Sequence, residues 1–325
     1  MAEDIGALIE AVRAHPGVRG KAAIGLVREV FGDSDWQAGP GDDGAIVMNE
    51  GTALVVGGEA ILSAFVAADP YGAGVAAVTT NLNDLAAMGA WPLALVDTVT
   101  GPRAVVRPVL EGMRWAAGLY DVPVVGGHLT GTEGPPSLSA FGLGRADRPL
   151  SARAAAPGQS LVVAACLDGQ MRADFPFFPS FDERGGRLAG DVRLLAEGAS
   201  AGWVAAAKDV SMAGLVGSLA MLLECNRLGA TLDLDALPVP AGVTLREWLL
   251  CFPCFAFLLC VPGGAEGECL RAFGERGLAA AVAGALDDTG ELRLLQDGRS
   301  GVAFDLNRET VTGLSVPAAA RPAPA

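Results

Sequence analysis

Hydrophobic residues recur at helical spacing through the first 30 positions, with a break at Pro16-Gly17. This pattern predicts N-terminal helices within residues 1–33. Two short apolar runs, 45–48 and 53–56, flank a turn-forming tetrapeptide and predict a β-hairpin. The following pattern predicts helices over 71–89 and 105–120, and strands over 92–99, 122–125 and 137–143. The first half therefore has an α+β organisation.

A shift to alanine, proline and serine at residues 148–158 indicates a domain boundary. We accordingly divide the chain into an N-terminal domain, 1–150, and a C-terminal α+β domain, 151–325. The pattern of the second domain predicts a strand over 161–166 and helices over 192–201 and 215–227. Residues 168–190 are rich in Phe, Pro and Gly and predict an irregular loop or lid. The Ala- and Pro-rich tail, 317–325, is expected to be frayed.

Composition restricts the classes of partner. The chain has 325 residues and is 51% hydrophobic, enough for two folded domains. Its 23 basic and 37 acidic residues give a net charge of −14, which excludes a nucleic-acid backbone as the expected partner. An anionic substrate would need a metal cation or local arginines.

The longest apolar run does not predict a membrane segment. It extends from Trp248 to Val261 and is interrupted by Pro253, whereas a helix that crosses a bilayer needs about 20 apolar residues. The acidic N-terminus lacks the basic start of a secretory signal. We therefore expect a cytoplasmic protein without a membrane partner.

All six cysteines lie in the second half. Cys251 and Cys254 have the spacing of a redox motif or half of a zinc site. They stand in the apolar segment LLCFPCFAFLLC, however, and this context favours a buried strand with structural thiols.

Several standard catalytic signatures are absent from the sequence. It contains no GxxxxGK[ST] loop, no strand followed by GxGxxG and no GxSxG motif, and its two histidines, His15 and His128, do not form HExxH. These absences argue against P-loop, dinucleotide-binding, zincin and serine-hydrolase chemistry.

Acidic and amide residues beside glycines are the first candidate site. Asp42 and Asp43 stand in GDDGA, and Asn81, Asn83 and Asp84 interrupt a helix that is otherwise apolar. Carboxylates in such positions suit a divalent cation, and polar groups in an apolar helix need partners. An ordinary turn and structural capping explain the same residues, so both interpretations stay open.

Two further segments are candidates for phosphate or metal binding. Gly126, Gly127 and His128 follow a short strand, where tandem glycines either admit a phosphate or form a tight turn. Asp209 and Ser211 precede a predicted helix, where they either handle ions or act as an N-cap.

The order of these motifs is more specific than any one of them. GDDGA, NLNDLAAMGAWP, VVGGHLT, GLGRAD and DVSMAGL follow one another between residues 41 and 215, within a resemblance that covers about residues 20–310. This series resembles the superfamily of aminoimidazole ribonucleotide (AIR) synthetase, thiamine-monophosphate kinase, selenophosphate synthetase and the hydrogenase-maturation dehydratase. It is most similar to an AIR synthase-related branch.

The resemblance implies a two-domain fold. The N-terminal sheet would form a barrel with that of a second copy in a homodimer, and the C-terminal α+β domain would close over it. The implied cofactors are ATP and Mg²⁺, with acidic loops in place of a P-loop. The implied metal ligands are Asp42, Asp43, Asp84 and Asp209. The implied nucleotide-binding residues are Asp43, Asn83, Gly126, Gly127, Arg145 and Ser211. His128 and Asp84 would be catalytic.

This chain departs from the family pattern at several positions. His128 stands where the kinase-like pattern has Asp, and Met212 replaces a second Asp after Asp209. Glu59 is at the acidic position after the first hairpin, but the stretch that usually follows it is missing. The N-terminal Cys or selenocysteine of a selenophosphate synthetase has no counterpart.

The sequence therefore predicts ATP- and Mg²⁺-dependent phosphoryl transfer to, or activation of, a small-molecule acceptor, in the manner of thiamine-monophosphate kinase. One alternative is an AIR synthetase-like activation of an amide or amidine followed by ring closure. The other is a catalytically inactive nucleotide-binding or scaffolding homologue.

Overall fold

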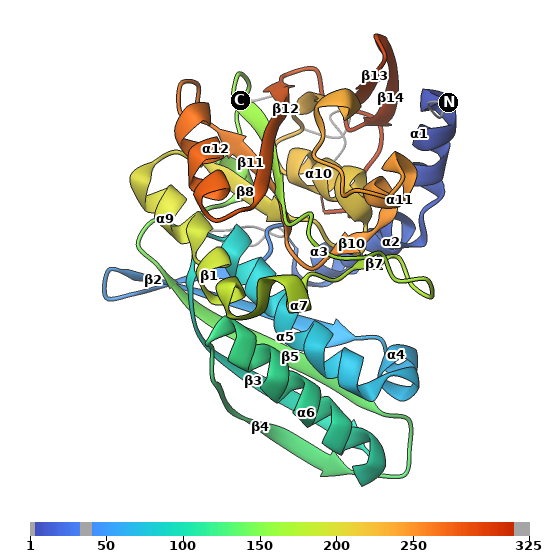
Figure 1. The fold of residues 1–325 in the computed structure, drawn as a ribbon, viewed down its shortest axis with the longest axis vertical. Coiled ribbons are helices and arrows are strands. Elements are labelled where there is room, and N and C mark those ends of the chain that lie inside the picture. Colours follow the sequence, from blue (N-terminus) through green and yellow to red (C-terminus); the bar gives the residue numbers. More distant parts are fainter. Residues whose placement is uncertain (1–3, 33–40, 315–325) are drawn as a thin grey trace. The chain divides into compact units, whose positions relative to one another are not determined.

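The computed structural model describes residues 4–32 and 41–314, which form two compact units (Figure 1). The first unit contains residues 43–149 and 181–200. The second unit contains the described residues up to Asp42, together with 150–180 and 201–314. The predicted frayed tail lies outside the described residues, as do residues 1–3 and 33 of the predicted N-terminal helices.

The first unit is built on a five-stranded sheet with the order β1-β2-β5-β3-β4. The strands are β1 (Ala45–Asn49), β2 (Thr52–Ile61), β3 (Trp91–Gly101), β4 (Val124–Gly131) and β5 (Ser137–Ala146). β3 and β4 are parallel, and the other neighbours are antiparallel. The predicted hairpin is confirmed, and Glu50 and Gly51 take the positive φ angles that its tight turn requires.

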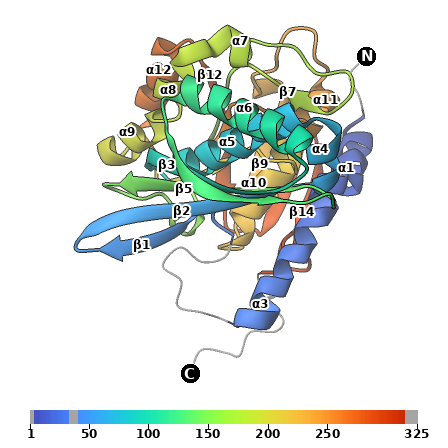
Figure 2. The same cartoon turned by 90° about the horizontal axis from the view of Figure 1, so that it is seen from below.

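Helices cover one face of this sheet (Figure 2). They are α4 (Ser63–Ala68), α5 (Pro70–Ala87) and α6 (Arg103–Tyr120). Asp69 caps α5 by accepting a hydrogen bond from the Gly72 N–H. The helices α5 and α6 touch through their backbones, because a Cβ at Gly74 would lie 2.0 Å from the Val109 oxygen and one at Gly112 2.1 Å from the Tyr71 oxygen.

The opposite face of the sheet carries exposed apolar side chains. Val47, Val56, Val96 and Phe141 are 49%, 40%, 39% and 42% exposed. They alternate with residues that face the helices, such as Val55, Leu95 and Ala140. The unit therefore has one buried and one open sheet face.

Strand β4 runs through the tandem glycines. The predicted strand 122–125 starts later, at Val124, and the expected tight turn at Gly126-Gly127 is wrong, because Val124 and residues 126–131 pair with β3, with a bulge at Val125. A glycine is required at 127, where a Cβ would lie 2.4 Å from the Asp97 Oδ1 atom of the neighbouring strand.

The segment after residue 177 is regular, so the prediction of an irregular loop over 168–190 is wrong there. It contains β7 (Phe177–Phe178), α7 (Phe181–Arg184), the 3₁₀ turn Gly185–Arg187, α8 (Leu188–Asp191) and α9 (Leu194–Ala201). Arg184 forms two 2.8 Å hydrogen bonds to Asp191, and both side chains are fully buried. Arg193 donates to the Tyr120 and Asp121 oxygens at the end of α6. These contacts attach residues 181–200 to the first unit.

The second unit contains a seven-stranded sheet with the order β14-β13-β9-β12-β6-β11-β8. Its strands are β6 (Ser160–Ala165), β8 (Ala206–Asp209), β9 (Gly229–Asp233), β11 (Ala256–Val261), β12 (Ala279–Asp287), β13 (Glu291–Gln296) and β14 (Arg299–Asp305). Its helices include α10 (Gly214–Glu224), α11 (Leu245–Leu250) and α12 (Glu266–Glu275). β7 and β10 (Phe252–Pro253) form a separate small parallel pair.

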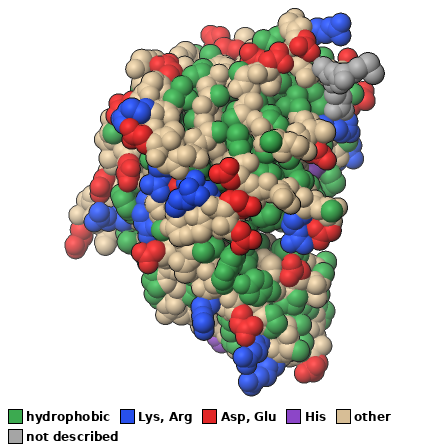
Figure 3. Space-filling view, in the orientation of Figure 1, with side chains coloured by type: hydrophobic (Ala, Val, Ile, Leu, Met, Phe, Trp, Pro, Cys, Tyr) green, Lys and Arg blue, Asp and Glu red, His purple; other side chains and the backbone are tan. Residues whose placement is uncertain are grey.

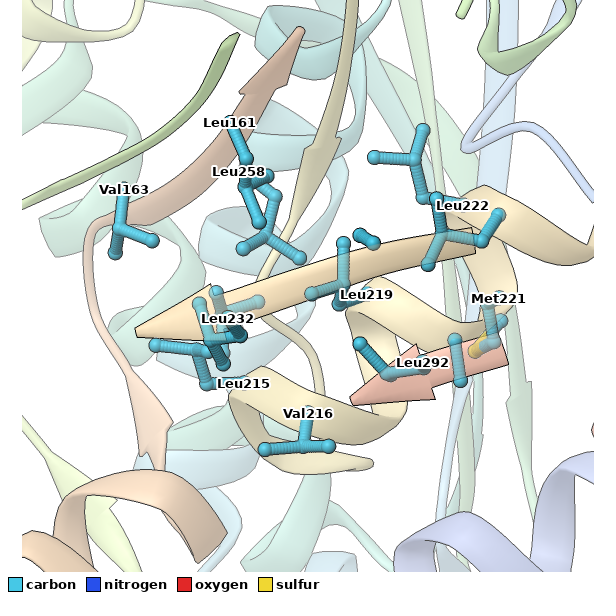
Figure 4. Packing of buried hydrophobic residues seen from close by; sticks show 14 of the residues in the cluster. Leu161, Val163, Leu215, Val216, Leu219, Met221, Leu222, Leu232, Leu258 and Leu292 are labelled. Carbon is cyan, nitrogen blue, oxygen red and sulfur yellow. The ribbon is translucent and has the colours of Figure 1, made fainter. Parts of the chain in front are cut away.

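The core of the second unit forms around α10. Figure 4 shows Leu215, Leu219 and Leu222 of this helix gathered with apolar side chains from four strands. Leu8 and Val12 of α1 (Ile5–Ala14) and Val18 of α2 (Pro16–Gly20) belong to the same buried cluster. The N-terminal helices, which continue to α3 (Gly25–Phe31), thus pack with the second unit although they precede the first in the chain. The division of the chain into domains 1–150 and 151–325 remains a prediction.

The Cys251 and Cys254 side chains are fully buried, and both thiols are free. Burial raises the pKa of the Cys251 thiol to about 12. The structural interpretation of these cysteines is confirmed, although the segment is the end of α11 followed by β10 and β11 instead of one strand.

The surface agrees with the acidic composition. On the face drawn in Figure 3, lysine and arginine side chains occur in small groups between acidic ones. Among the helices of residues 4–32 and 41–314, none has both the length and the apolar character needed to span a bilayer.

The buried ion pair gives a stability prediction. Asp191→Ala leaves the buried Arg184 guanidinium without its carboxylate, so we expect a loss of about 3 kcal/mol in the free energy of unfolding, measured in urea. Asp174→Ala is the matched control, because Asp174 makes the same two-bond pair with Arg172 but is 67% exposed. It should lose less than about 1 kcal/mol. Equal losses would contradict the importance of burial.

Candidate functional site

Two acidic side chains of the first unit converge. Asp43 lies just before β1, and Asp84 lies on the last turn of α5. A carboxylate oxygen of one lies within 4.8 Å of a carboxylate oxygen of the other. Asp84 is only 7% exposed, whereas Asp43 is partly exposed. The sequence analysis named both residues as metal ligands, together with Asp42 and Asp209, and that assignment remains a prediction.

Close packing against the sheet holds Asp84 in place. One turn earlier on α5, the Asn81 amide donates to the Ala77 oxygen at 2.8 Å and to the Ala140 oxygen of β5 at 3.2 Å. On β2, a Cβ at Gly57 would lie 3.4 Å from the Asp43 oxygen and 3.9 Å from the Asp84 Cβ. Gly57 of β2 thus lies beside both acidic residues, and the Asn81 amide ties α5 to β5.

Asp42 has a different environment from Asp43. It belongs to the second unit, where its two oxygens accept hydrogen bonds from the Ser151 hydroxyl and the Ala152 N–H, both at 2.6 Å. Burial raises the pKa of the Asp42 carboxyl, and these two bonds and nearby Lys208 partly oppose that effect. Asp42 therefore binds the start of the 3₁₀ turn Ala152–Ala154, whose N-cap is Ser151, and its assignment as a metal ligand remains a prediction.

Asp97, an acidic residue that the sequence analysis missed, lies on the helix-covered face of the first unit's sheet. Asp97 of β3 pairs with Ala140 of β5 and Gly127 of β4, and Glu59 of β2 pairs with Ala140 from the other side. These residues form one row across the helix-covered face. Asp97 is 7% exposed, and burial raises its pKa. Its strand parity with Leu95 and Val99 is the signal that predicts a buried acid here.

The open face of the sheet receives other predicted residues. His128 pairs with Thr98, one position beyond the Asp97–Gly127 pair, so its side chain points to the face opposite Asp97. Arg145 lies on the same strand face as exposed Phe141 and makes a 3.7 Å ion pair with Asp147. The structure therefore separates His128 and Arg145 from Asp84. Gly126 shares their face, whereas Gly127 faces Asp97. Asn83 is buried on α5.

The remaining predicted residues lie in the second unit. Asp209 ends β8 and is 3% exposed, and its Oδ1 atom is 3.3 Å from the Lys208 Nζ. The Ser211 N–H donates to the Ser218 hydroxyl of α10 at 3.0 Å. This bond ties the loop after β8 to the helix that follows it.

The donor chemistry of Asp43 and Asp84 fits a hard divalent cation. Mg²⁺ prefers carboxylate oxygen, usually takes one or two carboxylates from the protein and keeps several waters. One partly exposed and one buried carboxylate within 4.8 Å meet that requirement. Residues of the first unit thus suffice for the protein's share of such a site.

Two family models match the chain. The N-terminal domain of the AIR synthase related proteins matches residues 41–146, and the C-terminal domain matches residues 184–297.

Curated relatives include proteins of several kinds. A Synechocystis protein described as uncharacterised is 32% identical over 278 residues, 85% of this chain and 86% of the relative. A thiamine-monophosphate kinase of Rhodopirellula baltica is 34% identical over about half of each chain. A phosphoribosylformylglycinamidine synthase subunit PurL of Synechococcus is 29% identical, covering 71% of this chain and 34% of the relative. The chain thus spans about a third of that PurL relative.

Solved structures show the same fold. Thermotoga maritima PurL complexed with FGAR has a TM-score of 0.75 at 18% identity, covering 97% of this chain and 54% of PurL. AaThiL complexed with AMPPCP and TMP has a TM-score of 0.64 at 19% identity, covering 87% and 96% of the two chains. Together with the family models and the Synechocystis relative, these matches show that the chain belongs to the AIR synthase related protein family.

Proposed function

We propose that the chain is an ATP- and Mg²⁺-dependent enzyme of the cytoplasm that transfers a phosphoryl group to an oxygen of a small acceptor. The convergence of Asp43 and Asp84 is the observation that carries this proposal. A chain with a net charge of −14 needs local cations to bind an anionic nucleotide. The solved relatives complexed with ATP and with AMPPCP support a nucleotide as ligand.

In this proposal Asp43 and Asp84 of the first unit hold Mg²⁺, and Asp209 is a further ligand only as the family resemblance implies. The bound cation would neutralise charge on the transferred phosphoryl group. The protein's own contribution is positioning: Asn81 fixes α5 on β5, and Asn83, Gly126, Gly127 and Ser211 are candidates for contacts to the nucleotide.

We further propose that Asp97 faces the acceptor. Its carboxylate lies over Gly127, and burial raises its pKa above the ordinary value of an Asp carboxyl. The Asp97 carboxyl would accept a hydrogen bond from the attacking hydroxyl and orient it. The proton-carrier role expected for His128 receives less support, because His128 lies on the opposite sheet face.

The reaction products distinguish the proposed kinase activity from two alternatives. An AIR synthetase-like enzyme would phosphorylate an amide or amidine oxygen, and ring closure would then release orthophosphate together with ADP. A kinase would release ADP and leave the phosphoryl group on the acceptor. An inactive nucleotide-binding homologue would bind ATP without releasing either product, and Met212 in place of an expected carboxylate favours that reading.

We also propose that the open sheet face pairs with a second copy of the chain, as the family resemblance implies. Its exposed apolar residues are the supporting observation. Phe141 is central, since its ring lies over Gly58, where a Cβ would be 2.4 Å from the ring. A second sheet would remove these side chains from water and produce a barrel across a homodimer.

The metal–nucleotide site is tested by thermal unfolding with a non-hydrolysable ATP analogue. A ligand at about 100 times its Kd stabilises a protein by about 2.7 kcal/mol, so the midpoint should rise with Mg²⁺ and not with EDTA. Asp84→Asn and Asp43→Asn should lose this rise. Asp42→Asn should retain it, because both Asp42 oxygens already accept hydrogen bonds from Ser151 and Ala152. No rise with any nucleotide would refute the proposal, and screening acceptors for ADP and orthophosphate would then be pointless.

Burial of Asp97 gives a pH-dependent prediction. Because its pKa is raised in the folded state, the ionised carboxylate destabilises the fold above its ordinary pKa, and this penalty disappears on acidification. Asp97→Asn should therefore raise the free energy of unfolding at pH 7 by about 1 kcal/mol, and the gain should approach zero near about pH 4. Asp147→Asn, at an exposed carboxyl, should show no such trend. A pH-independent gain for Asp97→Asn would contradict the assignment.

Light scattering after gel filtration tests the homodimer. Wild type should have twice the 33.0 kDa chain mass, and Phe141→Asp should reduce it to that of one chain. Phe175→Asp is the control, because Phe175 has nearly the same exposure, 43%, but lies in the second unit. A monomeric wild type would refute the dimer.

A further inference from the structure

The loop that carries Ser211 packs against the N-terminal helix α2. This loop, residues 210–213, joins β8 to α10 in the second unit. A Cβ at Gly17 of α2 would lie 1.8 Å from the Met212 oxygen, 2.7 Å from the Met212 carbonyl carbon and 3.0 Å from the His15 Nδ1 atom. Nonbonded atoms do not approach as closely as the first of these distances, so the missing side chain of Gly17 makes room for the Met212 carbonyl.

Position 17 requires space and not the backbone freedom of glycine. Gly17 lies inside the helix α2, and its φ angle is not positive. Alanine is the best helix former at such a position, so the Met212 carbonyl is the nearest obstacle to an alanine there. Gly20, the last residue of the same helix, differs in this respect, because a Cβ at Gly20 meets nothing within 4 Å.

The helix α10 anchors both sides of this contact. Val18 of α2 is 6% exposed, and a Cβ at Gly217 of α10 would lie 2.7 Å from the Val18 Cγ2 atom. The Ser211 N–H donates to the Ser218 hydroxyl of α10 at 3.0 Å. Helix α2 and the 210–213 loop are therefore both fixed on α10, and Gly17 decides how closely they approach each other.

We propose that Gly17 is a positioning residue that sets the path of the 210–213 loop and with it the position of Ser211. The inference rests on the proposed function, in which Ser211 is a candidate contact to the nucleotide. Because the peptide unit is rigid, a displaced Met212 carbonyl carries the adjacent Ser211 with it. Helix α2 lies outside both segments that match the family models, 41–146 and 184–297, so this support comes from the chain's own N-terminal helices.

Calorimetric titration with a non-hydrolysable ATP analogue and Mg²⁺ tests this inference. Gly17→Ala forces the Met212 carbonyl to move, and we expect it to bind the analogue about tenfold more weakly, as for the loss of one hydrogen bond to a charged group. Gly20→Ala adds the same methyl group to the same helix in open space, and its Kd should stay within about twofold of the wild-type value.

A double-mutant cycle with Ser211→Ala separates positioning from a general structural loss. If Gly17 acts through Ser211, adding Gly17→Ala to Ser211→Ala should weaken binding by less than about twofold further. Full additivity of the two losses would overturn the positioning role, because Gly17 would then affect binding by a route that does not include Ser211.

Hydrogen exchange of the wild type keeps the inference testable if Gly17→Ala does not fold. Coupling between two sites is reciprocal, so a saturating concentration of the analogue with Mg²⁺ should slow amide exchange in α2. The slowing should be at least about threefold greater than in α12, which packs on β12 and β6 of the same unit. Equal slowing in the two helices would overturn the inference.

The outcomes separate this inference from the proposed function. If wild type and Gly17→Ala bind the analogue equally well, the positioning role is overturned and the nucleotide site stands. Equal weakening by Gly20→Ala also overturns it, because any methyl group added to α2 would then have the same effect. If wild type binds no nucleotide, both proposals fail.

Discussion

The first unit depends on the burial of α5 on nearly all sides. Its middle and C-terminal residues are inaccessible to water, which is possible only because α6 and the sheet approach its backbone directly. Gly74 and Gly112 remove the side chains that would separate the two helices. Asn81 bonds the helix to β5 through the Ala140 oxygen. With the helix fixed in this way, Asp84 has one position available, beside Asp43 and under the backbone of β2.

Periodicity was sufficient for those elements whose hydrophobic pattern reflects one local environment. The hairpin, α5 and α6 are of this kind, and Asn81 has the hydrogen-bond partners that a polar residue of an apolar helix needs. The sequence did not predict β4, because glycine is permissive and the pairing with β3 that extends it is a long-range contact. It also did not separate Asp42 from Asp43, since adjacent residues look alike until Ser151 and Ala152 are known to bind one of them.

Strand parity explains the other differences. The sequence pattern presents Gly126, Gly127 and His128 as one candidate site, but successive side chains of a strand point to opposite faces. His128 therefore leaves the face that holds Asp97 and Glu59. Asp97 was not a candidate in the sequence analysis, because a single acidic residue in an apolar strand does not by itself indicate a buried position. Its parity with Leu95 and Val99 indicates the buried face, and its pairing with Ala140 and Gly127 places it in the interior of the sheet. The short helices within residues 181–191 escaped prediction for a similar reason, since Arg184 pairs with Asp191 only in the folded segment.

The hydrogen bonds of Asp42 also have a topological meaning. The chain leaves the second unit after Asp42 and returns to it at Leu150, and the bonds from Asp42 to Ser151 and Ala152 bring these two points together. Residues 43–149 therefore resemble a domain inserted into a loop, because the residues on either side of the insertion lie close together. Lengthening such an insertion costs the receiving unit little, because the entropic cost of closing a loop grows only slowly with its length. Its length and content are consequently free to change through insertion or circular permutation, while the unit that receives its ends keeps its own fold.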